Sequence, residues 1–222
     1  MVKGRLPRKR VAVLISGRGS NMRSLIEAAR DPLFPAEVVL VLSNRPDAPG
    51  LAAAKAEGIA TAAVDHKIYA GRAEFEASLQ AVLDIHRVEL VCLAGFMRML
   101  TPAFVTAWSG RLINIHPSLL PSYRGLHTHE RALEDGVRIH GCTVHFVTAG
   151  VDEGPIIAQA AAPVMDDDTP ETLGSRVLEQ EHRLYPLALG LVAGGRVRVE
   201  GNRVLVEGPC AAPAALVSPA PA

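Results

Sequence analysis

The sequence predicts an α/β fold built on a mostly parallel sheet. Short apolar runs of strand length alternate with segments of helical spacing along the first half of the chain. Strand–helix–strand units of this kind form right-handed crossovers on a parallel sheet. The chain has 222 residues, of which 49% are hydrophobic, and this is enough to bury a large core in one domain. We therefore expect a single domain over residues 11–207, with a twisted, Rossmann-like sheet flanked by helices.

The expected elements follow from apolar periodicity and from turn residues. The first half should contain strands at 11–15, 38–42, 59–64 and 90–94, and helices at 22–30, 50–57 and 72–85. The second half should contain strands at 112–115, 139–147 and 155–161, and helices at 101–108, 125–134 and 170–191. Thr169 is the expected N-cap of the last helix. A C-terminal hairpin within 196–206 is indicated by the Gly201–Asn202 turn.

Charge and cysteine content argue against several classes of protein. The 23 basic and 23 acidic residues cancel, so bulk charge does not suggest a nucleic-acid surface. No apolar run approaches the roughly 18–20 residues that span a bilayer. The three cysteines form no CxxC pair, which argues against a zinc site and fits a reducing compartment. We expect a cytoplasmic protein, a monomer or homodimer, that acts on small molecules and binds no metal, nucleic acid or membrane.

The two ends of the chain lack any helical or strand periodicity. They are a basic leader over residues 1–10 and an Ala/Pro-rich tail over residues 208–222. Neither carries a pattern of residues to bury, so we expect both to be disordered and the tail to be dispensable for activity.

A glycine-rich turn joins the first strand to the first helix. It reads Ser16-Gly17-Arg18-Gly19-Ser20-Asn21. Glycines let the backbone approach a ligand, and the free N–H groups at a helix N-terminus favour an anion. No Walker lysine follows, and Met22 stands where a dinucleotide fingerprint has its third glycine. The turn indicates a site for a single phosphate, although an ordinary strand–helix turn has the same pattern.

Asn114 and His116 form a polar pair at the end of an apolar strand. Residues two apart in a strand point to the same face, so the amide and the imidazole should emerge together. Pro117 stops the strand here, and open α/β sheets bind ligands at this end. Taken alone, such a pair is more often a plain strand terminus. We also expect the Leu120–Pro121 bond to be cis, because the chain must turn sharply.

Five motifs together resemble those of the folate-dependent formyltransferases. They are SGRGSN (16–21), AGFMRML (94–100), INIHPSLLPSYRGLHTH (113–129), HFVTAGVDEGP (145–155) and QEH (180–182). The resemblance extends over roughly residues 11–198. The Asn-x-His pair with PSLLP and a downstream Asp is specific for the superfamily, and SGxGSN is similar to the members that act on glycinamide ribonucleotide.

The resemblance implies a formyltransferase fold, an activity and a set of site residues. A member of this family would transfer the formyl group of 10-formyltetrahydrofolate, its co-substrate, to the amine of 5'-phosphoribosylglycinamide in purine synthesis. The positions that match the catalytic triad are Asn114, His116 and Asp152. The positions that match contacts to the nucleotide substrate are Gly19, Ser20, Asn21 and Glu181. The positions that match contacts to the formyl-folate are Arg72, Met97, Arg98, Met99, Leu100 and the loop from Val147 to Asp152.

The chemistry of the three catalytic candidates suits formyl transfer. Transfer to an amine passes through a tetrahedral oxyanion, for which Asn114 and a protonated His116 are suitable donors. A carboxylate such as Asp152 beside the imidazole would favour the charged ring and could relay the amine proton. Taken singly, Asp152 could equally be a turn-forming loop acid, and Glu181 a helix-surface carboxylate.

Three other functions would each require a feature that this sequence does not show. A methionyl-tRNA formyltransferase would carry a further C-terminal domain, but only a hairpin and the tail follow residue 198. A formyltetrahydrofolate hydrolase would carry an additional N-terminal domain, but the first strand is expected already at Val11. A non-catalytic dinucleotide-binding module would have an acid after the second strand, where Ser43 and Asn44 stand.

Two positions depart from related sequences. Arg18 stands where many relatives have another polar residue, and the loop TAGVD lacks the acid that some carry before Asp152. His127 and His129, two apart in an expected helix, point in different directions and do not indicate a metal pair.

Overall fold

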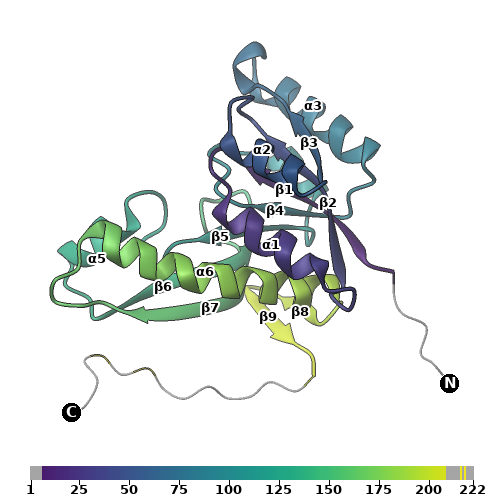
Figure 1. Cartoon of the computed structure of the whole chain (residues 1–222). Coiled ribbons are helices and arrows are strands. Elements are labelled where there is room, and N and C mark those ends of the chain that lie inside the picture. The colour runs from purple at the N-terminus through teal and green to yellow at the C-terminus, as the bar shows by residue number, and fades with distance from the viewer. Residues whose placement is uncertain (1–6, 209–215, 217, 219–222) are drawn as a thin grey trace.

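The computed structural model describes residues 7–208, 216 and 218, which form a nine-stranded sheet with helices on both faces (Figure 1). The strands are β1 (Lys9–Ile15), β2 (Ala36–Ser43), β3 (Ala60–Ala63), β4 (Leu90–Leu93), β5 (Leu112–His116), β6 (Ile139–Phe146), β7 (Ile156–Pro163), β8 (Val197–Glu200) and β9 (Arg203–Val206). The helices are α1 (Ser20–Arg30), α2 (Pro49–Ala56), α3 (Arg72–Ile85), α4 (Pro102–Ala107), α5 (Thr128–Glu134) and α6 (Pro170–Ala193), with a short 3₁₀ turn η1 at His66–Ile68.

The sheet is mostly parallel, as the sequence predicts. Its strand order is β3-β2-β1-β4-β5-β6-β7-β9-β8. The strands from β3 to β5 are parallel to their neighbours and are connected through α1, α2, α3 and α4. β6 runs antiparallel to β5, and β7 antiparallel to β6. The C-terminal hairpin is β8–β9, with β9 beside β7. The carboxyl ends of the parallel strands β1 to β5 therefore meet at one edge of the sheet, where the antiparallel strand β6 begins.

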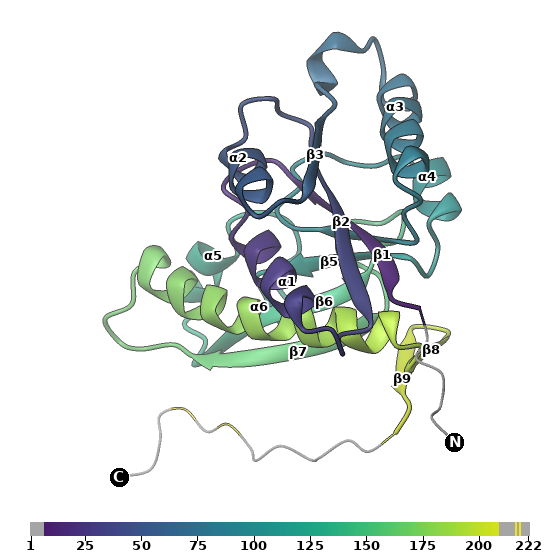
Figure 2. The same cartoon turned by 45° about the vertical axis from the view of Figure 1, so that its right-hand side comes forward.

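Two hydrophobic cores lie on opposite faces of this sheet. Figure 2 shows the helices that cover these faces, α1 and α6 on one and α3 and α4 on the other. Along β1, Val11 and Val13 belong to one core while Ala12 and Leu14 belong to the other, as the alternation of a strand requires. The first core receives the apolar faces of α1 and α6, and the second those of α3 and α4. Because β1 is buried on both faces, it reads as an unbroken apolar run rather than an alternating one.

Most element boundaries lie one or two residues from the expected ones, and two of the differences have a clear physical reason. β1 begins at Lys9, which pairs with Ala36, so two residues of the expected leader belong to the sheet. α5 begins at Thr128 rather than at residue 125. The preceding Gly125 and His127 have φ angles of 79° and 57°, and a right-handed helix cannot contain this left-handed conformation.

Three other expectations can be compared with the structure. The Leu120–Pro121 peptide bond is cis, as expected. Over the described residues, no helix combines the length and apolarity needed to cross a bilayer. Residues 1–6 of the leader and most of the tail, including Cys210, lie outside the described residues.

The turn before α6 is fixed by a dense set of hydrogen bonds. Thr169 is the N-cap, as predicted, and forms a reciprocal capping box with Thr172. The side chain of Asp168 is only 2% exposed and accepts both guanidinium nitrogens of Arg176 at 2.6 and 2.9 Å. It also accepts from the Met165 amide at 2.8 Å. The Arg176 hydrogen bonds hold the pKa of the Asp168 carboxyl well below its usual range.

Replacing this carboxylate should destabilise the fold in a pH-dependent way. Asp168→Asn breaks a buried ion pair, so we expect a loss of about 2–3 kcal/mol, or a fall in Tm of roughly 5–10 °C, near neutral pH. The pKa of the Asp168 carboxyl is lower in the folded than in the unfolded protein, so the ionised group stabilises the fold at pH values above the unfolded pKa of about 3.9. This stabilisation is lost as the pH falls through the folded-state pKa. The difference in Tm should therefore shrink below about pH 4. Asp166→Asn, at an 85% exposed side chain in the same turn, is the control. A difference that is constant with pH would contradict this role.

Candidate active site

The end of β5 places Asn114 and His116 on one face of the sheet, as predicted from their spacing. β6 pairs antiparallel beside them, with His145 opposite Asn114 and Thr143 opposite His116. Directly opposed side chains on one face lie within contact distance. The strand pairing therefore adds His145 to the polar pair.

The His116 ring is held by oxygen atoms at both nitrogens. Its Nε2 donates to the carbonyl oxygen of Tyr123 at 2.9 Å, and its Nδ1 lies 3.3 Å from Oδ2 of Asp152. The side chain is only 7% exposed. A protonated imidazole can donate to both of these acceptors at once, whereas a neutral ring can satisfy only one.

Asp152 connects the loop after β6 to the loop after β5. Its Oδ2 also accepts the Gly125 amide at 3.0 Å, so one oxygen atom contacts both the end of β5 and the β5–α5 loop. Its backbone has φ 51°, the left-handed conformation that a non-glycine residue adopts only where its surroundings support it. The residue expected to be catalytic is thus fixed by hydrogen bonds in an uncommon conformation.

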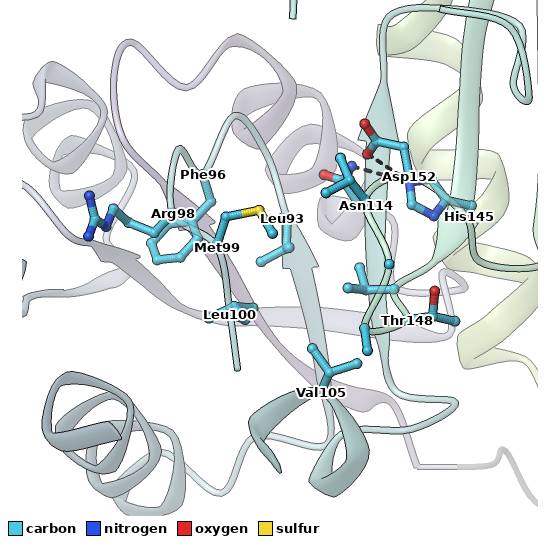
Figure 3. Close-up of a pocket in the computed structure, with 14 residues that line it drawn as sticks. Leu93, Phe96, Arg98, Met99, Leu100, Val105, Asn114, His145, Thr148 and Asp152 are labelled. Atoms are coloured by element: carbon cyan, nitrogen blue, oxygen red, sulfur yellow. Dashed lines mark hydrogen bonds and ion pairs between the residues drawn. The ribbon is translucent and has the colours of Figure 1, made fainter. Parts of the chain in front are cut away.

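His145 orients the amide of Asn114. Its Nδ1 lies 2.9 Å from the Phe146 carbonyl oxygen and so carries the proton, which leaves Nε2 as an acceptor. Asn114 Nδ2 donates to that Nε2 at 3.3 Å (Figure 3). Burial lowers the pKa of His145, so the ring is neutral and its 3.7 Å approach to Asp152 Oδ1 is not an ion pair. The Asn114 amide nitrogen has two N–H groups, and this contact uses one of them.

A cavity of about 150 Å³ opens beside these side chains. Figure 3 shows Asn114, His145 and Asp152 at one end of it, with Phe96, Arg98 and Met99 across from them. Of the positions expected to contact the formyl-folate, Arg98, Met99, Leu100 and the loop from Val147 to Asp152 line this cavity. His116 does not line it and contacts Asp152 from outside.

The other two expected folate positions lie outside this cavity. Met97 is 65% exposed and lines a neighbouring hollow of about 350 Å³, which Arg98 also lines. Arg72 is exposed at the start of α3 and lines neither of these two cavities. The structure therefore brings all of the expected folate positions except Met97 and Arg72 together around one cavity.

The glycine-rich turn has the backbone geometry of an anion site. Gly19 precedes α1 with φ 72° and ψ 42°, and α1 has no side-chain hydrogen bond capping its N-terminus among the described residues. Gly50, in α2, packs against this turn, and its amide donates to the Gly17 carbonyl oxygen at 3.1 Å. A Cβ on Gly50 would also lie 2.9 Å from this Gly17 oxygen, closer than a Cβ normally approaches a backbone atom, so glycine suits this position. The free amides at the start of α1 suit a phosphate.

Asn21 and Glu181 form a buried pair next to this turn. The Asn21 amide donates to Glu181 Oε2 at 2.6 Å, and both residues are less than 10% exposed. Burial raises the pKa of Glu181, and the hydrogen bond from Asn21 acts against that rise. Asn21 Oδ1 is buried without a partner among the described residues. The two side chains expected to contact the nucleotide thus touch each other across α1 and α6.

Comparison with known proteins agrees with this arrangement. The family model "Formyl transferase" matches residues 9–189. This chain is a member of the formyl transferase family.

Individual members of the family match most of the chain. A phosphoribosylglycinamide formyltransferase of Escherichia coli (strain K12) is 44% identical over 198 residues, covering 89% of this chain and 93% of that protein. The trifunctional purine biosynthetic protein adenosine-3 of Gallus gallus is 53% identical over 190 residues, but this chain spans only 19% of its length. The crystal structure of glycinamide ribonucleotide transformylase 1 from Symbiobacterium toebii superimposes with a TM-score of 0.87 at 48% identity, covering 90% of this chain and 94% of that one.

Sequence reasoning gave His145 no role in this formyl transferase. The only signal was a histidine in an expected strand, and its position opposite Asn114 depends on a strand register that the sequence does not reveal. The carbonyl oxygen of Tyr123 was missed because a backbone acceptor in a loop has no signal in the side-chain pattern.

His129 packs against His140 with ring centroids 5.3 Å apart. Burial lowers the pKa of His129, and of His140 to about 4. Among the residues described, no group of three or more His, Cys, Asp or Glu could hold a metal ion.

The phosphate site can be tested at Gly19. Gly19→Val places a branched side chain at φ 72° and against the Met22 side chain, so we expect ribose 5-phosphate to bind at least fivefold more weakly. Binding of a folate analogue should change less than twofold. Gly58→Val, at φ 76° but with open space around it, controls for the backbone strain. Calorimetric titration measures all three proteins, and equal losses for both ligands would contradict a phosphate-specific turn.

Proposed function

We propose that this formyl transferase moves the formyl group of 10-formyltetrahydrofolate to the amine of 5'-phosphoribosylglycinamide. The observation that carries the proposal is the 44% identity across 93% of a phosphoribosylglycinamide formyltransferase, together with the Asn114–His145–Asp152–His116 cluster beside a cavity. A phosphate site at the glycine-rich turn supports a phosphorylated acceptor. Purine biosynthesis in the cytoplasm, with formyl-folate as the co-substrate and no metal, follows from the same proposal.

Asn114 is the proposed oxyanion donor. The acceptor amine attacks the formyl carbon, and the carbonyl oxygen becomes an oxyanion in the tetrahedral intermediate. One N–H of Asn114 is committed to His145, which fixes the direction of the other. A donor fixed before the reaction stabilises developing charge without reorganisation. His116 has its Nε2 on the Tyr123 carbonyl oxygen, so Asn114 is better placed than His116 to meet the oxyanion.

Asp152 is the proposed proton relay. Attack leaves a positive charge on the amine nitrogen, and the carboxylate facing the cavity can accept that proton. The same proton is then delivered to N10 of the folate as the bond between the formyl carbon and N10 breaks. The products are formylated nucleotide and tetrahydrofolate, with no net proton left on Asp152. His116 contacts the carboxylate without lining the cavity and holds it in place.

Glu181 and the start of α1 are the proposed site for the nucleotide. The phosphate would lie on the amides near Gly19, Ser20 and Asn21, and Glu181 lies directly behind Asn21. A carboxylate and an amide with a spare buried oxygen provide acceptors for hydroxyl groups. The folate would occupy the cavity lined by Arg98, Met99, Leu100 and Val147.

The activity is tested directly by formyl transfer. The purified chain is incubated with 10-formyltetrahydrofolate and glycinamide ribonucleotide, and formation of the formylated nucleotide is followed. We expect turnover that a tenfold excess of methionyl-tRNA does not reduce. Transfer to methionyl-tRNA, or release of formate without transfer, would contradict the proposal and favour the related enzymes.

The role of Asp152 is tested by substitution. Asp152→Asn keeps an oxygen that can accept the Gly125 amide but removes the proton acceptor. We expect kcat to fall by a factor of roughly 10²–10⁴, with little change in Tm or in the KM for the nucleotide. Asp47→Asn, at an exposed side chain paired with Arg45, is the control. A kcat within tenfold of the parent would remove Asp152 from the proton transfer.

A further inference from the structure

Two adjacent residues of one loop contact two adjacent residues of another beside the catalytic cluster. The Gly125 amide donates to Asp152, as described above. Arg124 precedes Gly125 and Glu153 follows Asp152, and Arg124 Nη1 donates to Glu153 Oε1 at 2.7 Å. The loop between β5 and α5 is thus joined to the loop between β6 and β7 at consecutive positions, and Asp152 stands at the centre.

Arg124 is itself fixed from the side of α5. Arg131 Nη1 donates to the Arg124 carbonyl oxygen at 2.8 Å, and the Arg131 guanidinium lies over the Tyr123 ring, 5.4 Å from its centroid. The Tyr123 hydroxyl donates to Asp135 at 2.9 Å. The Arg124 backbone therefore has a defined position, from which its side chain reaches across to Glu153.

The ion pair is too exposed to matter much for global stability. The side chains of Arg124 and Glu153 are 43% and 52% exposed, and pairs of this exposure contribute little to unfolding. Its effect is expected to be local instead. Asp152 has φ 51°, which persists only where neighbouring contacts hold it, and Glu153 is bonded directly to it in the chain.

We propose that Arg124 and Glu153 are positioning residues for formyl transfer. Their ion pair holds the two loops together and so keeps the Asp152 carboxylate facing both His116 and the cavity. This inference rests on the proposed function. Neither side chain lines the cavity, so both act through Asp152 and not on the substrates.

Gly150 offers a way to break the pair without removing either charge. A Cβ built on Gly150 would lie 2.1 Å from Glu153 Oε2 and 2.7 Å from its Cδ. These contacts are to the end of the flexible Glu153 side chain. In the Gly150→Ala variant this side chain should therefore move away from the new methyl group and so away from Arg124. The backbone of Gly150 has an ordinary φ, so the substitution adds no strain there.

The first experiment compares charge-neutralising variants. At low salt, Glu153→Gln and Arg124→Met should each lower kcat about three- to fivefold, with the KM for the nucleotide unchanged. At 0.5 M salt, screening weakens the pair in the parent, so the difference from the variants should disappear. Lys9→Met is the matched control, since Lys9 pairs with Glu89 at the same 2.7 Å and is 46% exposed.

The second experiment separates geometry from charge. Gly150 lines the cavity, so the Glu153→Gln background measures any direct effect of Gly150→Ala on the folate. Gly150→Ala should lower kcat about threefold more in the parent than in that background, where there is no ion pair to break. Arg124→Glu and Glu153→Arg should each lower kcat, and the double charge exchange should recover at least half of the parental value.

Two outcomes would overturn the inference. One is a kcat equal to that of the parent in both neutralised variants at low salt. The other is a decrease of the same size at low and high salt, because that would not be electrostatic. A parent protein without formyl transfer would instead contradict the proposed function, so the two failures are distinguishable.

Discussion

The carboxylate of Asp152 is the contact on which the rest of the site depends. One oxygen accepts the Gly125 amide and faces His116 Nδ1, and the other faces His145. A single group thus contacts the β5–α5 loop, the end of β5 and the neighbouring strand β6. Buried polar groups of this kind are costly unless every partner is present, so they define one arrangement of the loops rather than several.

The loop after β6 makes this contact by folding back along the sheet. β6 begins at the edge where the parallel strands end, and its last residue, Phe146, lies opposite Ile113 near the start of β5. The loop that carries Asp152 therefore starts beside Leu112, whose carbonyl oxygen accepts the Val147 amide at 2.9 Å. It then returns toward the end of β5, where Asp152 contacts His116, a residue 36 positions earlier in the sequence.

Much of the framework could be predicted because it depends on local patterns. Uninterrupted apolar runs identified β1, β2 and β4, and the spacing of Asn114 and His116 placed both on one face before any strand pairing was known. The cap of α6 was found from Thr169 and Pro170. Resemblance to a family, not periodicity, connected Asp152 with these residues.

The remaining features depend on contacts that the sequence does not encode locally. His145 joins the site through the β5–β6 register, and Tyr123 through a carbonyl oxygen that no side-chain pattern reveals. The start of α5 was placed too early, because a left-handed His127 is not apparent from its type. Lys9 and Arg10 are charged yet belong to β1, because a strand can extend beyond its apolar part along the edge of the core.

A double-mutant cycle between His116 and Asp152 measures the central contact most directly. The variants are His116→Asn, Asp152→Asn and both together, and the quantity is kcat at saturating concentrations of both substrates. If His116 acts through the carboxylate, the double variant should lose no more than about tenfold beyond the worse single variant, since residues that act as a unit are not additive. Losses that multiply fully would show two independent roles and would contradict the mechanism.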